Sequence, residues 1–121
     1  MQWLKQSDYD WDTASYMFQG GRYFYSVFMC HLAVEKALKG LFYEKLQEVP
    51  PKTHNLVSLL NKIGIKPPEE EGKFLIKLNS ASIITRYPED LEDIKKHYTE
   101  NATREILSTS KEVIQWIKNQ F

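Results

Sequence analysis

The stretch from Arg22 to Gln47 constrains the fold most, because it is apolar on more than one face of a helix. Two sets of side chains fall on separate faces at about 100° per residue. The large set is Phe24, Phe28, Leu38 and Phe42, and the small set is Ser26, Ala33, Ala37 and Gly40. A helix of this kind lies at the centre of a bundle or also at a subunit interface. We therefore expect a long central helix whose small residues let another backbone approach closely.

The remaining periodic segments are also helical, and prolines and glycines separate them. We predict helices from about Leu4 or Ser7 to Gln19, from an N-cap at Thr53 to Gly64, from Pro68 to about Thr85, and from about Thr99 to Asn119. The polar segment 89–98 is predicted as a loop or a loose helical turn. The sequence thus indicates one all-α domain over residues 1–121, an antiparallel up-and-down four-helix bundle with one additional short helix.

The charge and the cysteine content limit the classes of function that the chain can have. Sixteen basic side chains balance sixteen acidic ones, so the chain lacks the strong field of an autonomous nucleic-acid binder. A local basic patch remains at Lys95, Lys96, His97 and Arg104. The single cysteine, Cys30, excludes a disulfide framework and a cysteine-rich zinc site. No apolar leader and no run of about 18 apolar residues is present, which predicts a cytoplasmic protein without a membrane segment.

One polar line crosses the apolar stretch. His31, Glu35 and Lys39 follow one another at intervals of four residues and therefore share a helix face. Glu35 with Lys39 is a favourable helix pair. A buried charge must be paired, so the line is either an ion pair at the edge of the core or a polar site in a cleft. With His54 as a third ligand the line could bind a metal, but the sequence favours no metal and no cofactor.

Two further segments carry candidate site residues. His54 lies in "KTHNL", at the predicted start of a short helix. Arg86 and Tyr87 lie in "TRYPED", at the end of another. An arginine at a helix C-terminus is satisfied by the helix dipole and by free carbonyl groups. Its planar fork also suits a phosphate, and Tyr87 could stack on a base.

Taken in order, these segments resemble the HEPN (higher eukaryotes and prokaryotes nucleotide-binding) domain family over essentially the whole chain. The matching residues are Asp10-Trp11-x-x-Ala14, Gly21-Arg22-Tyr23, the run from His31 to Lys39, Pro51-x-Thr53-His54-x-Leu56, Thr85-Arg86-Tyr87-Pro88, and Trp116-Ile117. The resemblance implies an all-helical bundle that forms a homodimer. It also implies a separately encoded minimal nucleotidyltransferase as partner, in a pair similar to a toxin–antitoxin module.

Many members of that family are metal-independent ribonucleases that carry an Arg-x(4–6)-His motif across a dimer cleft. This chain departs from the motif, because the first histidine after Arg86 is His97, eleven residues away. The sequence therefore favours a binding module over an enzyme and assigns no catalytic residue. The alternative is a ribonuclease with a displaced histidine. In that case the weak candidates for a catalytic residue are Arg86, His97 and His54. A third hypothesis is a purely structural bundle whose small-residue face is the dimer or partner surface.

The principal hypothesis is a homodimeric HEPN module that binds a nucleotide or nucleic acid. The residues assigned to its site are Lys36, Lys39 and Arg86 for phosphate, Tyr87 for stacking, Glu35 for ordering the cations, and His31 and His54 beside them.

Overall fold

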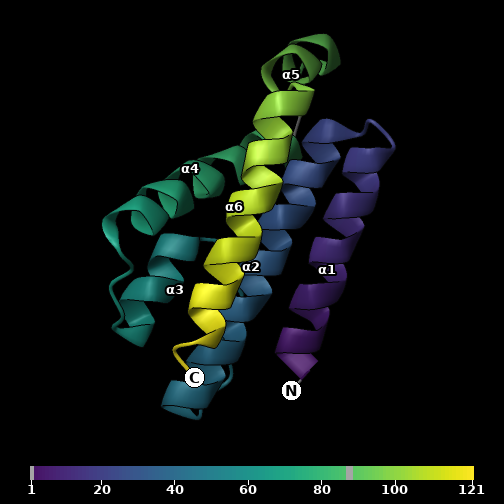
Figure 1. The fold of residues 1–121 in the computed structure, drawn as a ribbon. Coiled ribbons are helices and arrows are strands. Elements are labelled where there is room, and N and C mark those ends of the chain that lie inside the picture. Colours follow the sequence, from purple (N-terminus) through teal and green to yellow (C-terminus); the bar gives the residue numbers. More distant parts are fainter. Residues whose placement is uncertain (1, 87–88) are drawn as a thin grey trace.

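The protein is seen in a computed structural model that describes residues 2–86 and 89–121. The described residues form six helices and no strand, which confirms the all-α class (Figure 1). The helices are α1 (Gln2–Gln19), α2 (Tyr23–Leu46), α3 (Leu56–Ile63), α4 (Glu69–Arg86), α5 (Leu91–His97) and α6 (Glu100–Lys118). No helix among the described residues is long and apolar enough to cross a membrane.

The segment predicted as a loop or loose turn forms α5, so two short helices accompany the four long ones. The carboxylate of Asp90 caps α5 by accepting hydrogen bonds from the backbone N–H groups of Glu92 and Asp93. Ile94 and Tyr98 bury their side chains against the rest of the protein. Capping and these two apolar anchors stabilise a helix that its polar composition alone did not indicate.

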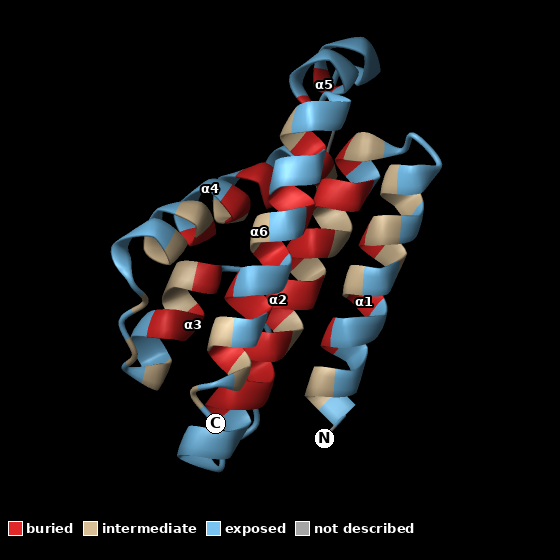
Figure 2. Cartoon of the chain, viewed as in Figure 1, coloured by how far each residue is buried: buried red, intermediate tan, exposed pale blue. Residues whose placement is uncertain are grey.

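The long helix α2 is the centre of the fold, as its two apolar faces predicted. It contacts all five other helices. Figure 1 shows α1, α2 and α6 side by side, with both chain termini at the same end, and α4 inclined across them. Buried residues occur on all sides of α2, whereas α1 and α6 each bury one side (Figure 2).

The small-residue face of α2 is internal, because α1 packs on it. Ser26 Oγ donates a hydrogen bond to the carbonyl oxygen of Ala14 at 2.7 Å, and Ser7 Oγ donates one to that of Ala33 at 2.6 Å. Side-chain hydroxyls reach the backbone of the neighbouring helix only where two helices approach closely. The hypothesis that this face is a dimer or partner surface is therefore wrong.

The start of α3 also differs from the prediction. Its N-cap is Asn55, whose side chain accepts a hydrogen bond from the N–H of Ser58, and not Thr53. Asn is at least as good a cap as Thr. The N–H of Leu56 is held from α4, by the Asn79 side-chain oxygen at 2.9 Å. His54 consequently lies before the helix instead of in its first turn. The predicted helix end is confirmed, with Gly64 in the left-handed region at φ 84°.

Candidate functional site

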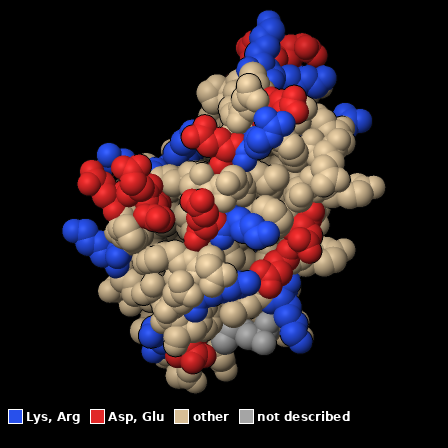
Figure 3. Space-filling view, viewed as in Figure 1, with Lys and Arg blue, Asp and Glu red and all other residues tan. Residues whose placement is uncertain are grey.

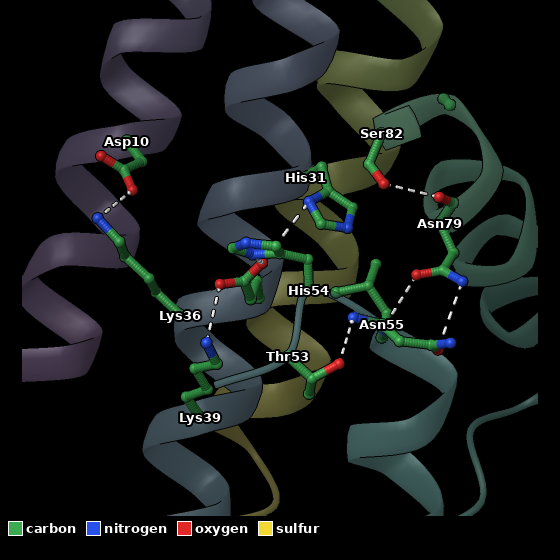
Figure 4. A network of polar contacts seen from close by, with 12 residues as sticks. Asp10, His31, Lys36, Lys39, Thr53, His54, Asn55, Asn79 and Ser82 are labelled. Atoms are coloured by element: carbon green, nitrogen blue, oxygen red, sulfur yellow. Dashed lines mark hydrogen bonds and ion pairs between the residues drawn. The ribbon is translucent and has the colours of Figure 1, made fainter. Parts of the chain in front are cut away.

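The carboxylate of Glu35 is the centre of a polar cluster inside the bundle (Figure 4). Its side chain is only 5% exposed. Lys39 Nζ donates to one oxygen at 3.0 Å, and His54 Nδ1 donates to the other at 2.8 Å. Both oxygens of this buried carboxylate thus have a partner, which a buried charge requires.

Two structural elements bring these residues together. The interval of four residues puts His31, Glu35 and Lys39 on one line of α2, as the sequence predicted. His54 comes from the loop between α2 and α3, and its side chain is 56% exposed. Glu35 holds the Nδ1 proton of His54, so the neutral ring offers Nε2 as an acceptor. The arrangement presents one oriented imidazole at the surface above a buried ion pair.

His31 is fully buried under this cluster. Its Nδ1 lies 3.9 Å from the nearer Glu35 oxygen, too far for a hydrogen bond, and neither ring nitrogen has a hydrogen-bond partner of good geometry among the described residues. Burial lowers the pKa of His31 to about 4. The negative charge of Glu35 and the nearby backbone of His54 oppose this shift only in part, and the positive charge of Arg86 adds to it. His31 is therefore neutral at neutral pH and is not a phosphate-binding cation.

Arg86 ends α4 close enough for its charge to act on His31. Its guanidinium carbon lies 4.9 Å from the ring centroid of Phe28, in a cation–π contact. One guanidinium nitrogen, Nη2, is buried and has no hydrogen-bond partner among residues 2–86 and 89–121. No carboxylate in this part of the chain lies within ion-pair distance of Arg86. The guanidinium group of Arg86 therefore has an N–H donor without an acceptor in the described part of the chain.

The other predicted site residues do not join the cluster. Lys36 points towards α1, away from His31 and His54, and forms an ion pair with Asp10 at 2.7 Å (Figure 4). His97 is exposed on α5, where its ring packs edge-on against Tyr98 with centroids 4.7 Å apart. Tyr87 lies outside the described residues.

Sequence reasoning missed two residues, one that pairs with Lys36 and one that holds the start of α3. In the sequence, Asp10 was noted only as part of the family match, although it lies three residues after Ser7 on the buried side of α1. Asn79 fixes the start of α3 from α4, and its Nδ2 also lies 3.4 Å from Asn55 Oδ1. The spacing of Asp10 was a usable signal. Asn79 gave none, because its role depends entirely on a tertiary contact.

Charge over the face in Figure 3 is mixed, with acidic and basic side chains interspersed and acidic groups at the start of α4. Within the described ranges, no group of three or more His, Cys, Asp or Glu side chains is arranged to hold a metal ion. The site therefore consists of paired charges, one exposed imidazole and one guanidinium without a carboxylate partner.

This fold and cluster define a small all-helical domain with a polar site on its central helix. The family model for the HEPN domain matches residues 1–120, so the chain belongs to the HEPN domain family. Its fold is similar to that of TT1696 from Thermus thermophilus, with a TM-score of 0.84 and 22% identity over 99% of this chain and 96% of that one. It is also similar to ST0689, an archaeal HEPN homologue, with a TM-score of 0.78 and 25% identity over 98% and 94% of the two chains. A search of curated proteins found no match.

Proposed function

We propose that this protein is a homodimeric HEPN binding module that holds a phosphate group of a nucleotide or RNA at Arg86. It acts with a minimal nucleotidyltransferase partner, in a pair similar to a toxin–antitoxin module. Membership of the family supports this assignment in general. The contacts of Arg86 support the location of the phosphate.

The observation that carries the proposal is that Arg86 has no carboxylate partner among the described residues, whereas the lysines assigned with it do. Lys36 is paired with Asp10 and Lys39 with Glu35. The buried Nη2 of Arg86 lacks an acceptor in the described part of the chain. A guanidinium fork binds phosphate in a bidentate manner. We therefore assign the phosphate to Arg86, with His54 as the exposed polar neighbour and Glu35 and Lys39 as the groups that position it.

The outer face of α4 supports the dimer. On this helix Ile76 and Ile83 are largely exposed, and Ile84 is about half-exposed. Ile76 and Ile83 are seven residues apart and therefore share a side. Single exposed apolar residues are ordinary, but a group on one helix is typical of an interaction surface. We assign this face to the contact between two copies of the chain.

Fluorescence anisotropy with a labelled single-stranded RNA tests the phosphate assignment. Arg86→Gln should weaken binding about tenfold or more, because one charge-assisted contact is lost. Lys45→Gln, at an exposed position in the last turn of α2, is the matched control and should bind as the parent does. Equal affinity of the two variants, or no binding by any form, would contradict the assignment.

One observation favours a second candidate function, a metal-independent ribonuclease in which His54 is the displaced histidine. His54 has the buried carboxylate that orients a general base, at 2.8 Å, whereas His97 has only an aromatic neighbour. His54 Nε2 would accept the proton of the RNA 2′-hydroxyl. The 2′-oxygen would attack phosphorus, and the 5′-oxygen would leave with a proton from water, giving a 2′,3′-cyclic phosphate and a 5′-hydroxyl. Cleavage lost in His54→Ala and kept in His97→Ala would support this activity, and the absence of cleavage by the parent would reject it.

A further inference from the structure

A pocket lies between the beginning of α2 and α5, at the end of the bundle away from the two termini (Figure 1). Its volume is about 460 Å³, within the range of small-molecule sites. Its lining comes from the segment 21–25 on one side and from two residues of α5, Leu91 and Lys95, on the other. None of these residues belongs to the Glu35 cluster, and Arg86 is not among them.

The walls of the pocket are aromatic. Tyr23, Phe24 and Tyr25 line it in succession, and Leu91 faces them from α5. The rings of Phe24 and Tyr25 lie against each other with centroids 4.4 Å apart, while Tyr25 remains half-exposed. Phe24 belongs to the core and keeps this wall in place. An offset-stacked planar ligand suits such a surface.

The polar lining of the pocket is positively charged. Arg22 makes no hydrogen bond or ion pair through its side chain among the described residues, and Lys95 has only an exposed contact of 3.9 Å with Glu92. No acidic side chain in the described part of the chain lines the pocket. Five other lysine and arginine side chains have a closer carboxylate in the described part of the chain, such as Arg104 with Glu100 at 2.8 Å. Two available cations beside an aromatic wall favour a ligand that is both planar and anionic.

We propose that this pocket is a binding site for a small aromatic anion. The planar ring lies on the wall formed by Phe24 and Tyr25. The phosphate or carboxylate group of the ligand lies between Arg22 and Lys95. This site is separate from the phosphate site proposed at Arg86, so either one can fail without the other.

Nitrogen–proton NMR titration of the labelled protein tests the proposal, with AMP, indole-3-acetate and adenosine as probes. AMP represents an aromatic phosphate, indole-3-acetate an aromatic carboxylate, and adenosine a ring without charge. At least one of the two anions should shift the amide signals of 21–25 and of α5 and should bind more tightly than adenosine. The anion that binds identifies the charged group the pocket takes.

Lys95 and its neighbour Lys96 on α5 give a matched comparison of variants. Lys95→Gln and Arg22→Gln should each weaken binding of the anion about tenfold, while adenosine binding stays the same. Lys96→Gln, an exposed neighbour that does not line the pocket, should leave binding unchanged. Arg86→Gln should also leave it unchanged, which separates this site from the proposed function. The proposal is overturned if no probe shifts these amides at millimolar concentration, if adenosine binds as well as the anions, or if Lys95→Gln and Lys96→Gln behave alike.

Discussion

His54 Nδ1 lies 2.8 Å from Glu35 Oε1, so a half-exposed loop residue is bonded directly to a buried carboxylate of the central helix. The same carboxylate is 3.0 Å from Lys39 Nζ. Glu35 therefore links the surface, the core and the start of α3 in one set of contacts. Removing Glu35 would leave the buried Lys39 and the imidazole of His54 without their common partner.

Glu35→Ala should lower the free energy of unfolding by about 3 kcal/mol, because breaking a buried ion pair strands its partner. Urea denaturation followed by circular dichroism measures the change. Glu44→Ala, at an exposed position on the same helix, is the control and should cost less than about 0.5 kcal/mol. Similar losses in the two variants would show that the Glu35 contacts add no stability.

Stability should fall as the pH drops from about 6.5 towards about 4, because of His31. Burial lowers its pKa from an ordinary 6.5 to about 4 in the folded protein. Between these values the unfolded chain binds a proton that the folded chain excludes, so acid favours unfolding. A shift of this size corresponds to a loss of at most about 3 kcal/mol in the free energy of unfolding at acid pH. Above pH 6.5 none of this stability is lost.

Melting temperatures measured between pH 4 and 7 test this dependence on His31. His31→Leu should flatten the curve in that interval, although it alters packing at every pH. His97→Ala, at an exposed position, should keep the slope of the parent. A slope that persists in His31→Leu would assign the pH dependence to other groups.

Ala33→Leu should destabilise the protein by about 1–3 kcal/mol without changing its oligomeric state. The extra carbons would meet α1, which approaches closely enough for Ser7 to bond the Ala33 carbonyl at 2.6 Å. Thermal denaturation gives the loss of stability, and light scattering after gel filtration gives the mass. Ser108→Leu, at an exposed position on α6, serves as the control. A change of mass in Ala33→Leu alone would contradict the internal packing of this face against α1.

Ile83→Lys should convert the proposed homodimer into a folded monomer, because a charge would be buried in the contact on α4. Ile83 is 67% exposed in the single chain, so the fold should tolerate the change. Gel filtration with light scattering measures the mass. Tyr9→Lys, at a more exposed apolar position on α1, should leave the mass unchanged. A parent protein that is monomeric, or a variant that stays dimeric, would reject this surface.

The regular parts of the fold follow from local signals. Periodicity located α2 and its burial, and Gly64 marked the end of α3 with a left-handed residue. The interval from His31 to Lys39 placed one face of the cluster correctly. These features depend on residues within a few turns of one another, which a single sequence displays.

Features that depend on distant contacts were not predictable in this way. The cap of α3 moved to Asn55 because Asn79 holds Leu56 from another helix. Lys36 was assigned to phosphate together with Lys39, yet its partner is Asp10 of α1. The small-residue face could equally have met a second chain, and only the packing of α1 decides that it does not. Periodicity gives the direction of a side chain and not the identity of its partner.

The position of His54 ahead of α3 has a consequence for dynamics. α3 is held by contacts to α2 and α4 and has only eight residues, too few to persist alone. Transient detachment of this short helix would withdraw His54 and admit water to Glu35 while α1, α2 and α6 stay assembled. Because α3 buries Leu56, Leu59 and Leu60 in the core, the candidate site is tied to a local opening that must also expose these leucines. Amide hydrogen exchange in α3, faster than in α2, would report how often the site is dismantled and rebuilt.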